Sequence, residues 1–104
     1  MMQSMMQSVL WLAGLLEGEG YFTYASRSLR IELKMTDRDV VARAAKILNV
    51  RVYKRGKRTR GGKVEWYFSV CGWRAAFWMR ALTPLMGRRR KRQIAHALRC
   101  AEAA

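Results

Sequence analysis

Acidic residues, proline, cysteine and long apolar runs are all scarce in this sequence. The longest strongly apolar run, 9–16, has eight residues, whereas a membrane-spanning helix needs about 20, so we expect no membrane partner. Only Met, Gln and Ser precede that run, which is not the pattern of a secretory signal. Cys71 and Cys100 fit no metal-ligand spacing. We therefore expect reduced thiols in an intracellular protein that is not secreted.

The shortage of acids leaves a strongly basic chain. There are 21 Lys and Arg against 7 Asp and Glu, a net charge of +14, and such a surface attracts polyanions. Charge alone fits both a protein that coats nucleic acid and a sequence-specific nucleic-acid machine. The 104 residues, 51% of them apolar, suffice for one domain with a core, which we assign to 1–104.

Hydrophobic periodicity predicts an α+β chain in the order αββαββαα. The first helix is apolar almost all round, so we expect a partner chain to cover part of it. Thr36 is expected to cap the second helix and Asn49 to end it. The expected elements are a helix at about 5–17, strands at 21–27 and 29–35, a helix at 36–48, a hairpin at 50–70, and helices at 72–82 and 88–103.

Two sequential hairpins predict a four-stranded antiparallel sheet with helices on one face and the other face open. Period-two alternation places polar, basic and aromatic side chains on that open face. They are Tyr21, Thr23, Arg27, Arg30, Glu32, Lys34, Lys54 and Tyr67. A register error of one residue would move any of them to the opposite face.

The segment Leu-Ala-Gly-Leu-Leu-Glu-Gly-Glu-Gly at 12–20 joins the first helix to the first strand. Gly14 and Gly18 lie four residues apart on one helix face, so two such helices can approach closely across a two-fold axis. Glu19 is then delivered to the end of the helix pair, beside the axis. Two carboxylates facing each other repel, and divalent cations such as Mg²⁺ or Mn²⁺ relieve that repulsion.

This segment resembles the LAGLIDADG motif, with Glu17 and Glu19 in place of its two aspartates. The resemblance extends over nearly the whole chain, because the family's αββαββα order matches the expected elements. It implies the LAGLIDADG fold, with the open sheet face for double-stranded DNA. A single motif implies a homodimer, whose interface is expected at Trp11, Leu12, Gly14, Leu15 and Gly18.

The resemblance also implies a homing endonuclease. Such enzymes make a staggered double-strand break in a pseudo-palindromic target by metal-assisted phosphodiester hydrolysis. Glu19 matches the family's catalytic metal-binding acid, with Gly18 beside it as a further metal ligand and Mg²⁺ as the cofactor, for which Mn²⁺ can substitute. The expected setting is a bacterial or phage-infected cytoplasm, or an organelle matrix.

Further catalytic roles follow from the same resemblance. Asp37 matches a polar residue that orders water near the metal, although its charge also suits the start of a helix. Arg89 or Lys91, within the basic run 88–92, matches the family's basic residue near the attacking water. The rest of that run is expected to contact phosphate.

The open face offers a chemistry for reading bases. A strand of about eight residues spans ~26 Å, the length of about eight base pairs. Arg27, Arg30, Lys34 and Lys54 can donate to guanine and Glu32 can accept from cytosine, whereas Thr23 and Tyr67 offer adaptable or apolar contacts. The basic hairpin tip is expected to grip phosphate through Lys57, Arg58, Arg60 and Lys63.

Two other interpretations stay open. A LAGLIDADG-fold DNA-binding regulator or intron RNA maturase would keep the sheet and the charge but would not cut. A general RNA-binding or ribosomal protein would need neither the paired glycines nor Glu19. Metal-dependent cleavage and preference for one duplex sequence distinguish these interpretations from an endonuclease.

Overall fold

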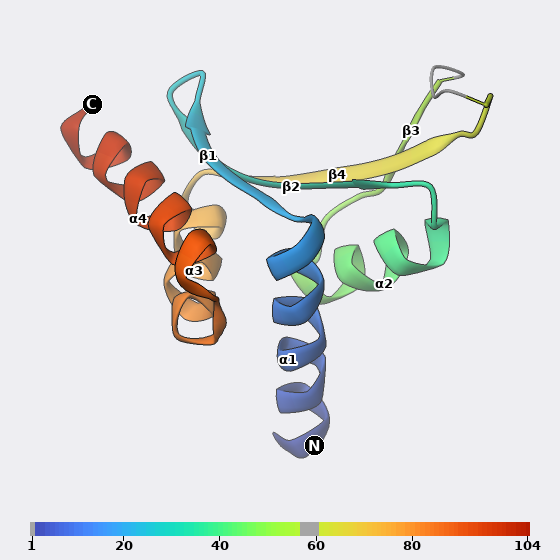
Figure 1. Cartoon of the computed structure of the whole chain (residues 1–104), viewed down its shortest axis with the longest axis horizontal. Helices are drawn as coiled ribbons and strands as arrows, with labels where there is room; N and C mark the ends of the chain where they lie inside the picture. Colours follow the sequence, from blue (N-terminus) through green and yellow to red (C-terminus); the bar gives the residue numbers. More distant parts are fainter. Residues whose placement is uncertain (1, 57–60) are drawn as a thin grey trace.

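The computed structural model describes residues 2–56 and 61–104. Within them the chain is an α+β fold with the expected order of elements (Figure 1). The expected phosphate contacts Lys57, Arg58 and Arg60 lie outside the described residues. The elements are α1 (Met2–Glu19), β1 (Tyr21–Ala25), β2 (Ser28–Met35), α2 (Arg38–Leu48), β3 (Tyr53–Arg55), β4 (Glu65–Cys71), α3 (Trp73–Leu82), the 3₁₀ helix η1 (Thr83–Leu85) and α4 (Arg88–Ala103).

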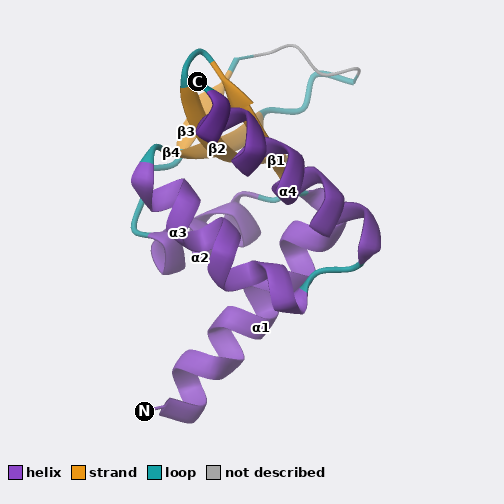
Figure 2. Cartoon of the chain, turned by 90° about the vertical axis from the view of Figure 1, so that its left-hand side faces the viewer, coloured by secondary structure: helices purple, strands orange, loops and turns teal. Residues whose placement is uncertain are grey.

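The four strands form one antiparallel sheet in the order β1-β2-β4-β3. The helices gather on one face of this sheet, and in the part of the chain that the structure describes the opposite face carries no helix (Figures 1 and 2). Phe22, Ile31 and Val70 form one cross-strand row and are buried against the helices. Because side chains alternate along a strand, their neighbours must point to the open face.

Helix α1 begins outside the rest of the fold and ends under the sheet (Figure 1). Leu12 and Leu16 are fully buried in the chain's own core, so the expected dimer contact through Leu12 is corrected. Trp11 is half-buried, with the Arg43 guanidinium of α2 4.0 Å from its ring centre. Leu15 is also half-buried. The fully accessible face of α1 is therefore formed by other residues.

The caps of α2 are only partly as expected. Asp37, not Thr36, is the N-cap residue, and it makes no side-chain capping hydrogen bond. Asn49 ends the helix in the left-handed conformation (φ 56°, ψ 52°), as expected, and Arg74 Nη2 donates to its carbonyl oxygen at 2.9 Å.

Two further expectations concern thiols and membranes. Cys71 and Cys100 are both free, and Cys100 Sγ lies 3.6 Å from His96 Nε2 on α4. Among the helices of the described part of the chain, none has the length and apolar character needed to cross a membrane.

The turn between β1 and β2 carries backbone strain. Ser26 and Arg27 both have positive φ, 54° and 63°, as a two-residue hairpin turn requires, yet neither is glycine. The left-handed region costs a non-glycine residue about 1–2 kcal/mol, part of which glycine gives back as backbone entropy. We therefore predict that Arg27→Gly raises the free energy of unfolding by about 0.5–1 kcal/mol in urea titrations.

The matched control is Arg55→Gly, because Arg55 is an equally exposed arginine in a strand. Its replacement should destabilise the protein or leave it unchanged, since glycine weakens strands. Stabilisation by both variants would mean that loss of positive charge, and not relief of the turn, is responsible.

Candidate functional site

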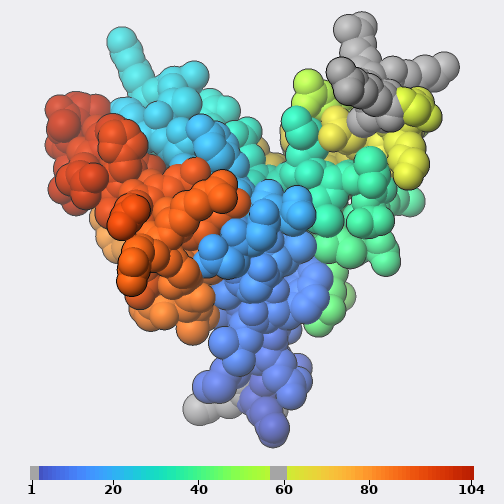
Figure 3. Space-filling view, viewed as in Figure 1, coloured from blue at the N-terminus to red at the C-terminus, as the bar shows by residue number. Residues whose placement is uncertain are grey.

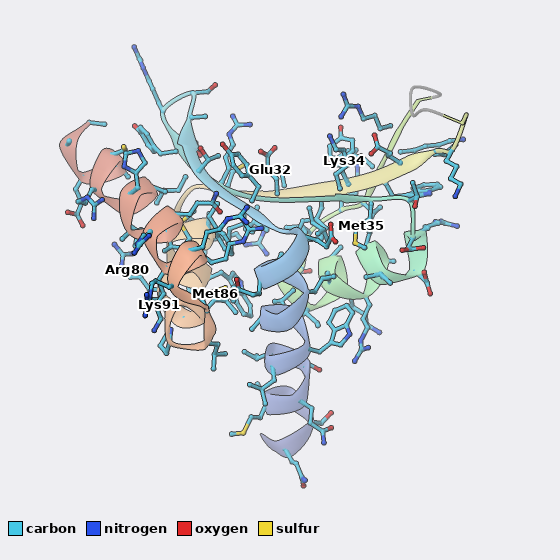
Figure 4. All side chains as sticks on the ribbon, in the orientation of Figure 1. Glu32, Lys34, Met35, Arg80, Met86 and Lys91 are labelled. Atoms are coloured by element: carbon cyan, nitrogen blue, oxygen red, sulfur yellow. The ribbon has the colours of Figure 1, made fainter. Side chains whose placement is uncertain are left out.

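The open sheet face is built from cross-strand rows of side chains. Tyr21, Glu32 and Ser69 form one row, and Thr23, Arg30 and Cys71 form the next. Lys34 lies opposite Tyr67, which in turn pairs with Tyr53, the two rings stacking at 5.5 Å. Figure 4 shows Glu32 and Lys34 on the side away from the helices and Met35 on the side of α2.

Two of the expected base contacts need correction. Lys54 pairs with Trp66, whose side chain packs against the core, so Lys54 belongs to the helix side of the sheet. Its neighbours Tyr53 and Arg55 take the open-face positions instead. Arg27 lies in the turn after β1 and not in the strand. Lys63 is exposed just before β4.

A hollow with a volume of about 490 Å³ lies on this open face. It brings Glu19 together with residues from all four strands, and Figure 3 shows the face dipping between the β1–β2 turn and the β3–β4 end. Two carboxylates and two cations therefore share one concave surface. The lining residues are Glu19, Tyr21, Glu32, Leu33, Lys34, Arg55, Tyr67 and Phe68.

Glu19 reaches the hollow because the chain turns directly from α1 into β1. The Gly20 N–H still donates to the Leu16 carbonyl oxygen at 3.0 Å. A Cβ at Gly20 would lie 2.8 Å from that oxygen and from Leu16 Cδ2. Only glycine permits so close an approach, so Gly20 fixes where the helix ends and where Glu19 is exposed.

The residues before Glu19 are held by α4. Arg90, only 7% exposed, donates from Nε to the Glu17 carbonyl oxygen at 2.8 Å and from Nη2 to the Gly18 carbonyl oxygen at 3.5 Å. The Glu17 carboxylate accepts a hydrogen bond from the Gly87 N–H at the start of α4. A cation at the C-terminal end of α1 also offsets the negative end of the helix dipole.

The segment that follows Glu19 is also held by α4. Gln93 Oε1 accepts from the Phe22 N–H at 3.2 Å and from Arg90 Nη1 at 3.0 Å. Arg90 and Gln93 therefore hold the backbone on both sides of Glu19 by hydrogen bonds. Charged hydrogen bonds of this kind compensate the cost of burying a guanidinium.

The basic run was expected to place Arg89 or Lys91 near Glu19, but both side chains are exposed. Figure 4 shows Lys91 on the side of α4 away from α1. The residue that the structure brings to the motif is Arg90. A signal for it was present in the sequence, because Arg90, Ile94 and Ala97 are spaced by four and three and form one helix face.

Asp37 is not brought to Glu19 within one chain. It lies at the start of α2, beside a second hollow lined by Thr36, Arg38, Asp39 and Ala42. Its position fits the role of a negative charge at a helix N-terminus.

The oxygen donors around Glu19 suit a hard cation. The Glu19 carboxylate is exposed, Glu32 lines the same hollow, and the Gly18 carbonyl keeps one lone pair beyond its long bond to Arg90. In the described residues, no group of three or more His, Cys, Asp or Glu within one chain could hold a metal ion. The oxygen set offered by one chain is thus small.

The accessible face of α1 runs straight to this site. Met6, Leu10, Gly14 and Gly18 recur every four residues and are all exposed, Leu10 by 52%. A Cβ built at Gly14 or Gly18 would meet nothing within 4 Å among residues 2–56 and 61–104. The two glycines therefore serve no packing requirement of the single chain.

Replacing the Arg90 guanidinium with an apolar side chain tests how much its hydrogen bonds to α1 stabilise the fold. We predict that Arg90→Met lowers the free energy of unfolding by about 2–3 kcal/mol, because buried acceptors lose a charged donor. Arg89→Met, on the same turn but exposed, should stay within about 0.5 kcal/mol. Urea unfolding of both variants measures the difference, and equal losses would show that Arg90 acts only through its charge.

No protein-family model, curated protein or solved structure matches the chain, so the residues of the site alone carry the functional argument.

Proposed function

We propose that this protein is a homodimeric, site-specific DNA endonuclease of the LAGLIDADG homing endonuclease type. It makes a staggered double-strand break in a pseudo-palindromic target by metal-assisted hydrolysis. The observation that carries the proposal is that Glu19, the last acid of the motif-like segment, shares one hollow with the basic and aromatic open face of the sheet.

The free glycine face of α1 supports the dimer. Two copies can pack Gly14 and Gly18 against each other across a two-fold axis, which also covers Leu10 and Met6. Such a pairing brings the two Glu19 carboxylates together at the end of the helix pair. The site of one chain is then completed by the other, in the arrangement of the LAGLIDADG fold.

The concave open face supports the choice of duplex DNA. Strand β2 has eight residues, a length of ~26 Å, which fits along a groove. Arg30, Lys34 and Arg55 lie on this face among Tyr21, Tyr53 and Tyr67. Arg30 Nε is buried without a hydrogen-bond partner in the described residues, so no such bond locks that atom to the protein.

Glu19 of each protomer, with the Gly18 carbonyl, would hold Mg²⁺ or its substitute Mn²⁺. Such an ion, when bound, polarises a phosphate and activates a water. Within the chain, Arg90 and Gln93 keep the Glu19 turn in place from both sides. Lys34 and Arg55 line the same hollow and can balance phosphate charge next to Glu19.

The direct test is a randomised duplex library incubated with the protein, with and without Mg²⁺, followed by sequencing of the cut ends. We predict staggered cuts at one palindrome-like sequence, and a loss of at least a hundredfold in Glu19→Gln, because the amide keeps the shape but not the charge. Glu102→Gln, an equally exposed acid at the end of α4, is the matched control and should cut normally.

Sequence-selective binding without cuts under any divalent cation would overturn the nuclease proposal in favour of a DNA-binding regulator. Binding without sequence preference would favour a general nucleic-acid-coating protein. A loss of cutting in Glu102→Gln equal to that in Glu19→Gln would show that acid loss in general, not the site, is responsible.

The glycine face gives a separate prediction about the dimer. Gly14→Ala should leave the single chain intact and even favour its helix by up to about 1 kcal/mol, since a Cβ there meets nothing. In the dimer the same Cβ meets the partner helix, so we expect dissociation to become at least tenfold easier by sedimentation equilibrium.

Gly56→Ala is the control, because a Cβ at Gly56 would likewise meet no atom of the described residues within 4 Å and Gly56 lies far along the chain from α1. It should leave self-association unchanged. An unchanged dimer in both variants, or a monomeric parent protein, would remove the α1 interface from the proposal.

A further inference from the structure

Helix α3 exposes two aromatic rings outside the core and away from the open sheet face, and one of them, Phe77, meets the ring of Trp78 edge-on at 5.7 Å. Trp73 is 79% exposed and Phe77 58% exposed. They lie one turn apart on the same face of the helix, which places their Cβ atoms about 5–6 Å apart. Arg80 continues that face towards the partly exposed Leu85 of η1. We call Trp73, Phe77 and Arg80 the α3 stripe.

The stripe lies in a segment of the chain without acidic residues. Between Trp66 and Ala101 the sequence contains no Asp or Glu. Two arginines of this region are occupied, since Arg74 donates to the carbonyls of Leu48 and Asn49 and Arg90 to those of Glu17 and Gly18. The remaining cations are exposed: Arg80, Arg88, Arg89, Lys91, Arg92 and Arg99.

The position of the stripe separates it from the proposed duplex site. Helices α3 and α4 lie on the covered side of the sheet (Figure 2), whereas the hollow with Glu19 lies on the open side. Figure 4 shows Arg80 and Lys91 on the same side of the α3–α4 pair, away from α1. A ligand on the stripe therefore need not displace a duplex from the open face.

The charge and shape of the α3 stripe limit the kinds of ligand that it can bind. A second copy of the stripe would bring cations against cations in a two-fold contact, which is repulsive. A membrane surface requires a broad apolar helix face, whereas α3 offers two rings and then Arg80. Exposed rings beside cations match the way that proteins bind single-stranded nucleic acid, by stacking bases and tracking phosphates.

We propose that the α3 stripe is a second nucleic-acid site, which binds a single strand. Trp73 and Phe77 stack on successive unpaired bases, and Arg80 contacts the adjoining phosphate. The ligand chemistry is unpaired bases on a phosphate backbone, which both RNA and single-stranded DNA provide. This site is independent of the proposed endonuclease activity and remains if that activity fails its own test.

The test uses fluorescein-labelled oligo(U) and oligo(dT) of about twelve nucleotides, and fluorescence anisotropy measures their binding to the whole chain described here. The variant Trp73→Ala/Phe77→Ala should weaken binding by about tenfold or more, the loss expected for two stacked bases. Trp73→Phe keeps a ring and should retain most of the affinity. Met5→Ala, which removes an exposed apolar side chain of α1 outside both the α3 stripe and the open sheet face, is the control and should bind as the parent does.

Ultraviolet cross-linking of 5-bromouracil-substituted oligomers, followed by peptide mapping, locates the strand directly. A cross-link within 73–80 supports the proposal, and a stronger affinity for oligo(U) or oligo(dT) identifies the source of the strand. Cross-links confined to the open-face strands overturn it. Equal affinity of the parent and the double variant for the oligomers also overturns the proposal. This holds even if the double variant loses self-association or binding to anionic phosphatidylserine vesicles.

Discussion

The hydrogen bonds between Arg90 and the end of α1 are the constraint on which the geometry of the candidate site depends. Helix α1 projects from the fold at its start (Figure 1), whereas Leu16 is buried in the core and α4 holds the last turn. Arg90 binds the carbonyls before Glu19, and Gln93 binds the N–H of Phe22 after it. With Gly20 allowing the tight exit, these contacts determine which way Glu19 faces. Glu17 closes the same junction by accepting from Gly87.

The sequence predicted the order of elements and most of the open face, because β2 alternates over its full length. Leu29, Ile31 and Leu33 are buried, and cross-strand pairing then assigns Thr23 and Tyr67 to the other face. The prediction was wrong at Lys54 for a physical reason. Strand β3 has three residues, all of them exposed, so no apolar residue in it sets the register. Its position follows only from pairing with β4.

Two other errors have the same origin in missing tertiary information. Helix α1 is apolar on nearly every side, so periodicity could not tell its core face from its free face, and Leu12 was assigned to the wrong one. The run 88–92 contains five cations in succession, which hides the helical period that singles out Arg90. In both cases a buried residue four positions further along the helix identifies the face that packs against the core. That residue is Leu16 for Leu12 and Ile94 for Arg90.

The distribution of charge is the strongest reason to favour cutting over coating. A protein that only coats nucleic acid gains nothing from carboxylates on its binding surface, because they repel phosphate. Yet two of the seven acids in the chain, Glu19 and Glu32, line the hollow of the open face. A divalent cation between carboxylate and phosphate turns that repulsion into attraction. These acids would therefore weaken phosphate binding in a coating protein, whereas a metal-dependent nuclease requires them. On the α3 stripe, where only binding is proposed, acids are absent.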